Sequence, residues 1–433
     1  MNYNELIRRD LYIEKLLSFA ANDNLSFVVG VRRAGKSSIA FQLEKELKNH
    51  CSDHEAVIRI NFETTGAVRM SSESLIAYVE EKCVNIKKCF LILDEVRHVK
   101  EFENAINFFT KNIDCKLFII SSSRRVISEK ITAVKEGKFE VVEALPLSLP
   151  EFILLQSFEE ITPESTPLLE KRYRYLSGKT YTIKEIYKIY ITYGGLPVMK
   201  PEYMNIERAR VITDGSYGAI VTRDILEIGA GEGIPAVTDP VLLRSVISIM
   251  AKSIGDNISA TWIGKQTAEV LQRPSATKTI ESYIRALVNA HLFYVAERYD
   301  IRSEQRLKTL AKYYIVDASL HNYVTVNSPE DESRLLENKV FFELLRRGYA
   351  VCNGKIGKEG VHLVAKDNFG KFYVQVVNEL NEENMEEILS PLRKIRDNHP
   401  KIVIVFNGKS SITEDGIIIL NALEFLMGYP LKR

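Results

Sequence analysis

One stretch of the sequence combines glycine, lysine and serine at a spacing that can bind phosphate. In FVVGVRRAGKSS, the pattern G-x-x-x-x-G-K-[ST] is matched by Gly30, Gly35, Lys36 and Ser37. The glycines let the backbone curl so that its N–H groups point at phosphate oxygens, and a following helix offers its positive N-terminus to the same anion. Lys36 would reach the β and γ phosphates of a nucleotide, and the Ser37 hydroxyl would bind Mg²⁺.

The alternative for this stretch is a chance match in a glycine turn, which average residue usage gives on the order of once in a hundred chains of this length. Here the match lies between a strand-like run and a helix-like run, as phosphate binding requires. We therefore predict that ATP contacts Gly30, Arg32, Arg33, Ala34, Gly35, Lys36, Ser37 and Ser38. The pattern does not require Arg32 and Arg33, which would be solvated or face the nucleotide of a partner subunit.

Two adjacent acids follow a second apolar run, in CFLILDEVRHV. At the carboxyl end of a buried parallel strand, Asp94 would hold the Mg²⁺ shell and Glu95 would orient and deprotonate an attacking water. Glu95 is therefore the candidate catalytic residue, and Ser37 and Asp94 are the candidate metal ligands. The alternative is a pair of acids that simply leave a strand into solvent. The next apolar run ends in Ser121, Ser122 and Ser123, which would touch the γ-phosphate or begin a polar loop.

The elements that position these residues alternate between strand-like and helix-like runs. Short, almost continuously apolar runs lie at residues 26–30, 57–63, 89–95, 116–122 and 139–145. Such runs are typical of buried parallel strands, and the polar segments between them are long enough for crossover helices. We therefore expect the first part of the chain to be a three-layer α/β domain with the parallel sheet of a P-loop NTPase. Helical patterns dominate after residue 155, and strand-like runs return in residues 333–433.

The composition of the chain is that of a soluble globular protein. Of 433 residues, 45% are hydrophobic and 27% are charged, and the net charge is +1, so any nucleic-acid surface must be local. No run approaches the ~18 apolar residues of a membrane span, and the N-terminus lacks the apolar core of a signal peptide. Five scattered cysteines without C-x-x-C spacing favour reduced thiols. These features predict a cytoplasmic protein with no membrane partner.

Further stretches follow one another in a specific order along nearly the whole chain. They are GVRRAGKSS, LILDEVRHVKEFE, LFIISSSRRVIS, EALPLSLPEFI, ITYGGLPVM, VTRDIL, TIESYIRALVNAHLFYVAERYD, KYYIVDASLHN and LENKVFFELLRRGYAV. This order resembles a large prokaryotic group of AAA+-like P-loop ATPases, whose relatives include the origin-recognition and STAND ATPases. The resemblance implies an ATPase core in residues 1–155, a helical lid in 156–245, a winged-helix domain in 246–328 and a restriction-endonuclease-like α/β domain in 329–433.

The resemblance also implies a binding site for the base of the nucleotide. In related ATPases a Gly-x-Pro of the lid packs on adenine, and the matching residues here are Gly195-Leu196-Pro197. Pro197 is therefore a candidate adenine contact, although YGGLP taken alone is simply a turn. Arg9 and Tyr12 lie in IRRDLYIEKL, which resembles the base-proximal segment of the family.

The sequence departs from the family pattern in three places. Relatives usually carry glutamine where this chain has Arg97, Thr-Gly-Ser-Asn where it has residues 120–123, and arginine where it has Lys138. Lysine keeps the positive charge but lacks the planar fork of arginine. We therefore expect that hydrolysis is slow and leave open which group supplies the trans-acting cation.

Residues 258–300 suit a winged helix. In SATKTIESYIRALVNAHLF, one helical face carries Ile280, Ile284, Leu287 and Val288, and the exposed face would carry Lys278, Glu281, Ser282 and Arg285. This is the pattern of the second helix of a helix-turn-helix, followed by a β-wing. The domain would bind DNA, or it would pack against the rest of the chain and hold the lid in place.

The C-terminal part resembles the nuclease fold but lacks its chemistry. Nucleases of this fold use an Asp and a [DE]-x-Lys on adjacent strands to hold Mg²⁺ and activate water. The matching positions here are His362, Gln375 and Val377, and Glu343 on the preceding helix has no evident acidic partner. We therefore expect a degenerate domain that is used for binding.

Together these patterns favour an ATP-binding P-loop ATPase that acts as a nucleotide-dependent switch. The alternative is an interaction module that binds ATP for structural order and hydrolyses little of it. The expected cofactors are ATP and Mg²⁺. The candidate partners are DNA, an unidentified protein and further copies of the chain.

Overall fold

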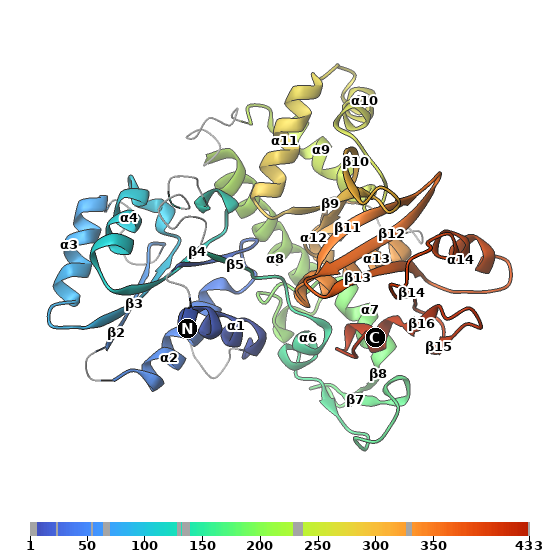
Figure 1. Cartoon of the computed structure of the whole chain (residues 1–433), viewed down its shortest axis with the longest axis horizontal. Helices are drawn as coiled ribbons and strands as arrows, with labels where there is room; N and C mark the ends of the chain where they lie inside the picture. Colours follow the sequence, from blue (N-terminus) through green and yellow to red (C-terminus); the bar gives the residue numbers. More distant parts are fainter. Residues whose placement is uncertain are drawn as a thin grey trace. The chain divides into compact units, whose positions relative to one another are not determined.

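The chain forms two compact units in the computed structural model, which describes residues 7–22, 25–52, 55–63, 70–127, 131, 139–227, 237–325 and 331–431 (Figure 1). The first unit comprises the chain up to Leu145 together with the short segment Asn289–His291. The second unit comprises Pro146–Val288 and Leu292–Arg433.

A parallel five-stranded sheet forms the centre of the first unit, with the strand order β2-β3-β4-β1-β5. Its strands are β1 (Leu25–Val29), β2 (Glu55–Asn61), β3 (Lys88–Asp94), β4 (Cys115–Ser121) and β5 (Glu140–Glu143). Its helices are α1 (Asp10–Asn22), α2 (Lys36–His50), α3 (Ser72–Lys82) and α4 (Phe102–Asn112), with the short turns η3 (Val96–His98) and η4 (Arg124–Val126). The five strands and the α/β fold expected from the sequence are therefore confirmed.

Alternate residues of the strands supply two apolar cores, one on each face of the sheet. Phe27 of β1 packs with Leu75 and Phe109 from α3 and α4, whereas the adjacent Val28 packs with Leu16 and Leu43 from α1 and α2. Helices therefore cover both faces, which explains why the strands are apolar throughout (Figure 1). The first unit is the expected three-layer arrangement.

The second unit begins with helices and a small antiparallel sheet. The helices are α6 (Leu149–Leu155), α7 (Ile183–Tyr193), α8 (Ile206–Ala219), α9 (Pro240–Lys252), α10 (Ala260–Leu271), α11 (Thr277–Asn289) and α12 (Ala318–Val324), with the π-helix η8 (Ile220–Glu227) and the short turns η6 (Leu168–Glu170) and η7 (Pro201–Tyr203). The strands β6 (Glu159–Glu160), β7 (Arg172–Arg174) and β8 (Thr180–Thr182) form a sheet that the sequence did not predict. They are too short and too polar for a period-two pattern to stand out.

An eight-stranded sheet forms the rest of the second unit, in the order β10-β9-β11-β12-β13-β14-β16-β15. Its strands are β9 (Phe293–Asp300), β10 (Gln305–Ile315), β11 (Ala350–Ile356), β12 (Glu359–Asp367), β13 (Gly370–Val377), β14 (Lys401–Val405), β15 (Ser411–Ile412) and β16 (Ile418–Asn421). The accompanying helices are α13 (Asp331–Arg346), α14 (Met385–Arg393) and α15 (Ala422–Leu426). Because β9 pairs in parallel with β11, the hairpin expected as a wing joins the sheet of the C-terminal part. The domain limits drawn from the sequence remain predictions.

One expectation about the cysteines is wrong. The structure joins Cys83 and Cys89 in a disulfide, whereas Cys51, Cys115 and Cys352 are free thiols. The reason is local, because the turn after α3 returns the chain directly to the start of β3 and places the two residues side by side.

Within the described parts of the chain, we find no helix with the length and apolar character needed to cross a lipid bilayer.

Candidate functional site

The stretch between β1 and α2 folds as a tight loop around the Lys36 side chain. The ammonium group of Lys36 is buried and donates hydrogen bonds to the carbonyl oxygens of Gly30 and Val31, at 2.9 and 3.0 Å. A Cβ atom on Gly30 would lie 2.3 Å from the carbonyl oxygen of Ala144, and Gly35 has φ of 89°, so both positions require glycine. Ala34 is buried, and Ser37 and Ser38 lie in the first turn of α2.

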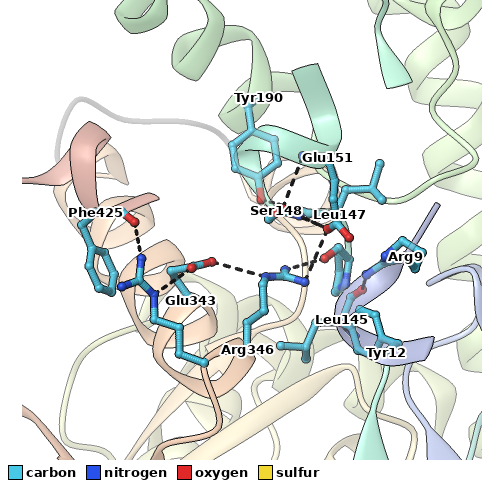
Figure 2. A network of polar contacts seen from close by, with 12 residues as sticks. Arg9, Tyr12, Leu145, Leu147, Ser148, Glu151, Tyr190, Glu343, Arg346 and Phe425 are labelled. Carbon is cyan, nitrogen blue, oxygen red and sulfur yellow. Dashed lines mark hydrogen bonds and ion pairs between the residues drawn. The ribbon is translucent and has the colours of Figure 1, made fainter. Parts of the chain in front are cut away.

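Arg9 and Tyr12 brace this loop from α1 and the residues before it. The Arg9 guanidinium donates to the carbonyl oxygens of Ala34 and Leu145, at 3.3 and 3.0 Å, and lies over the Tyr12 ring. The Tyr12 hydroxyl accepts a hydrogen bond from the Leu145 N–H at 3.2 Å, as Figure 2 shows. The two residues therefore fix the loop and the end of β5 to each other, and their predicted place near the base remains a prediction.

The two arginines in the loop behave differently from each other. Arg32 is buried and donates to Glu63, just after β2, with an Nη1 to Oε1 distance of 2.6 Å. Arg32 is therefore not solvated, and a place beside the nucleotide of a partner subunit remains a prediction. The sequence did not reveal its partner, because Glu63 lies 31 residues further along the chain. Arg33 is exposed and has φ of 69°.

Asp94 lies at the end of β3, beside the start of α2. Its carboxylate accepts hydrogen bonds from the Ser37 hydroxyl and from the Asn61 amide, the latter at 3.2 Å. Burial raises the pKa of Asp94 to about 6, and the neighbouring Glu95 carboxylate acts in the same direction. A hydroxyl and a buried carboxylate side by side are the oxygen ligands that Mg²⁺ prefers, so Ser37 and Asp94 fit the ion expected there.

Glu95 is held by two neighbours. Its Oε1 atom accepts the backbone N–H of Ser122, and its Oε2 atom accepts the Nε–H of Arg97, both at 2.7 Å. The Nη2 atom of the same arginine donates to the Ser122 hydroxyl at 2.7 Å, which closes a ring of three residues. Glu95 follows Asp94 directly in the sequence, and the contacts that folding adds are those with Arg97 and Ser122. The role of Glu95 as the base remains a prediction.

The other two serines, Ser121 at the end of β4 and Ser123 shortly after it, have local roles. The Ser121 hydroxyl accepts the N–H of Ser123 at 3.1 Å, and the Ser123 hydroxyl accepts the N–H of Arg125 at the start of η4. All three serines are buried, so they do not begin a solvated loop. Lys138, the other departure from the family pattern, lies outside the described residues.

His291 is a residue of this unit that the sequence reasoning missed. It lies in the segment Asn289–His291, is completely buried and has φ of 56°. Burial, helped by the nearby charges of Arg124 and Lys36, lowers the pKa of His291 well below its usual value, so the imidazole is neutral at neutral pH. Its only signal in the sequence is a histidine in an otherwise apolar run.

The candidate adenine contact Pro197 lies in the second unit, in the turn after α7. The nearby residue Gly195 makes structural contacts that do not involve a nucleotide. The Gly195 N–H donates to Asp317, and the Gly195 carbonyl accepts the N–H of Leu147, both at 2.7 Å. A contact between Pro197 and adenine remains a prediction.

The positions matched to a nuclease site lie on two adjacent strands. The His362 N–H donates to Gln375 Oε1 at 3.0 Å, and the Val376 N–H donates to His362 Nδ1 at 3.1 Å. Val377 is part of an apolar core. The helical acid beside these residues is Glu337, which the sequence analysis did not single out.

Glu337 and Glu343 each have cationic partners within the second unit. Glu337 accepts from Lys312 at 2.8 Å, whereas Glu343 pairs with Arg346 and Arg347 at 3.3 and 2.9 Å. Figure 2 shows Arg346 between Glu343 and Glu151. Within the ranges given above, no group of three or more His, Cys, Asp or Glu side chains could hold a metal ion.

Comparison with known protein families identifies two regions. Residues 22–153 match the family model described as an AAA domain, and residues 184–331 match a model described as a domain of unknown function (DUF8612). The first match supports an AAA-type P-loop ATPase domain that binds ATP, in agreement with the loop and the sheet described above.

The chain is also similar to whole proteins of other organisms. An uncharacterized protein of Haemophilus influenzae is 28% identical over 426 residues, which are 98% of this chain and 99% of that protein. An uncharacterized protein of Methanocaldococcus jannaschii is 25% identical over 408 residues, which are 91% and 82% of the two chains. Among solved structures, a Walker-type ATPase of Pyrococcus abyssi is similar with a TM-score of 0.47 and 13% identity, covering 74% of this chain and 96% of that one.

Proposed function

We propose that the first unit binds ATP with Mg²⁺ and hydrolyses it, and that the nucleotide state acts as a switch for the second unit and its partners. One observation carries this proposal. Folding brings the half-buried Ser37 against the buried acid Asp94, next to Glu95 and beside the loop of Lys36, although about 60 residues separate the loop from the two acids.

Each of these residues would have one task in the reaction. The loop N–H groups and Lys36 would bind the phosphates, and Ser37 and Asp94 would hold Mg²⁺, which neutralises developing charge. Glu95 would take a proton from a water whose oxygen forms a bond to the γ-phosphorus, while the bond from that phosphorus to the bridging oxygen breaks and ADP leaves.

A second candidate function is an ATP-binding module with little hydrolysis. It is favoured by the two hydrogen bonds that occupy the Glu95 carboxylate, from Arg97 and from the Ser122 N–H. Turnover of ATP by the pure protein, alone and with DNA, separates the two candidates.

The sharpest test of hydrolysis is Glu95→Gln. The amide cannot accept the proton, so we expect ATP binding by calorimetry to persist and phosphate release to stop. Glu80→Gln, at an exposed position on α3, is the matched control and should keep the parent rate. Hydrolysis by Glu95→Gln at the parent rate would remove Glu95 as the base.

Two further parts of the proposal concern the second unit. Pro197→Gly should change the ratio of ATP to GTP affinity if Pro197 contacts adenine, and an unchanged ratio would place it outside the base site. We also expect no cleavage of DNA or RNA with Mg²⁺ or Mn²⁺, because His362, Gln375 and Val377 cannot supply two carboxylates and a lysine. Metal-dependent cleavage that survives Lys36→Ala would contradict this.

A further inference from the structure

The ring formed by Glu95, Arg97 and Ser122 is almost completely enclosed. The side chains of Arg97 and Glu95 are 8% and 5% exposed, and the distance from Nε to Oε2 is 2.7 Å. A charge-assisted hydrogen bond in such surroundings is stronger than one at the surface, because little water competes for either group. The pair therefore fixes the direction of the carboxylate.

This direction is unsuitable for a general base. A base needs an oxygen lone pair within hydrogen-bonding reach of the water. In the ring, Oε1 faces the Ser122 N–H and Oε2 faces the Arg97 guanidinium. One lone pair of each oxygen is thereby engaged, and because the Glu95 side chain is only 5% exposed, a water reaches the remaining lone pairs only when the ring opens.

Arg97 makes a second hydrogen bond, to Ser122, and this bond requires the shape of a guanidinium. Its Nη2 atom donates to the Ser122 hydroxyl at 2.7 Å, and the residue follows Glu95 by only two positions, at the start of the short turn η3. Two separated donors on one rigid guanidinium can hold the ends of β3 and β4 together, which a lysine cannot do.

We propose that Arg97 is a positioning residue that holds Glu95 in a resting orientation and thereby limits the basal rate of ATP hydrolysis. The inference rests on the proposed function, since it concerns the same site. We expect ATP binding not to depend on Arg97, because the residues proposed to contact the phosphates are those of the loop and Lys36. Loss of the guanidinium should therefore raise kcat and leave KM for ATP nearly unchanged.

The test compares four variants of the full chain in a steady-state ATPase assay. Arg97→Gln keeps much of the size and removes the charge, so we expect kcat to rise several-fold with KM within about twofold of the parent. Arg97→Lys keeps the charge but loses the bridge to Ser122, and we expect an intermediate kcat. The double variant Arg97→Gln with Glu95→Gln should be inactive, which shows that the gained activity passes through Glu95. Lys100→Gln removes a nearby exposed charge and should leave both constants unchanged.

The outcomes separate this inference from the proposed function. Unchanged or reduced kcat in both Arg97 variants, with normal ATP binding, overturns the role of Arg97 and leaves the ATPase assignment intact. Loss of ATP binding in Lys36→Ala together with activity in Glu95→Gln overturns the assignment of the base instead. Should Arg97→Gln fail to fold, Arg97→Lys alone tests the inference. A kcat above that of the parent at an unchanged KM supports the role of Arg97, and an unchanged or lower kcat overturns it.

Discussion

The Gly195 N–H donates a hydrogen bond to the carboxylate of Asp317, with an N to Oδ2 distance of 2.7 Å. The other oxygen of Asp317 accepts the N–H of Ser319 at 2.9 Å, so the acid also caps α12. Asp317 is completely buried, and its contacts join the turn after α7 to the start of α12. Gly195 of the YGGLP stretch therefore has a structural role, whether or not the stretch also contacts a base.

Gly194→Ala should strongly destabilise the second unit. The residue has φ of +78°, and an added Cβ would lie 1.9 Å from Asp317 Oδ1, whereas Gly178 has a similar φ of +83° and open space around it. We expect Gly178→Ala to lower the free energy of unfolding by about 1 kcal/mol and Gly194→Ala by at least about 2 kcal/mol more. Urea unfolding followed by the fluorescence of Trp262 measures the difference, and equal losses would show that the clash is relieved.

Lys36→Ala should weaken ATP binding about 100-fold, or ~2.7 kcal/mol, because the loop loses the cation that its own carbonyls orient. Lys48→Ala on the exposed face of α2 removes the same charge from the same helix and is the matched control. Calorimetry of both variants gives the affinities. Affinity in Lys36→Ala equal to that of the control would contradict the assignment of the loop.

Glu337→Ala should destabilise the second unit by about 3–5 kcal/mol, because it leaves the buried ammonium of Lys312 without its carboxylate. The double variant Lys312→Met with Glu337→Leu removes both charges and should recover most of the loss. The comparison uses thermal or urea unfolding of the full chain. A double variant as unstable as the single one would mean that the hydrogen bond from Tyr314 to Glu337, rather than the ion pair, dominates.

The second unit should lose stability as the pH falls from about 6.5 to about 4. Burial lowers the pKa of His362 to about 4, so the folded imidazole stays neutral while the unfolded one binds a proton near its ordinary pKa of about 6.5. The unfolded state then binds more protons, and acid favours unfolding by on the order of 2 kcal/mol over this window. His362→Gln should flatten the dependence of the free energy of unfolding on pH, because the variant lacks this imidazole. His321 is present in both proteins and therefore cannot cause a difference between them. Identical slopes of stability against pH would exclude His362 as the source.

The sequence predicted those parts of the fold and the site that depend on residues close together in the chain. The loop from Gly30 to Ser37 is contiguous, and a buried parallel strand that ends in Asp94 and Glu95 has few other interpretations. Their meeting follows from the rule that parallel strands end at one edge of the sheet.

The partners of these residues could not be predicted in the same way. Ser122 lies 27 residues from Glu95, and Glu63 lies 31 residues from Arg32, so each pairing depends on side-chain directions that only the packed sheet fixes. Glu337 and Glu343 are both acids on α13, and nothing in their spacing says which of them faces His362.

The segment Asn289–His291 has a consequence for how the chain is made. It belongs to the first unit, although the residues before and after it in sequence belong to the second. At synthesis rates of about 5–20 residues per second, the ribosome adds this segment roughly 7–30 s after Leu145. The nucleotide-binding unit is therefore incomplete during that interval, and a fragment that stops at Leu145 would never receive the buried histidine beside Lys36.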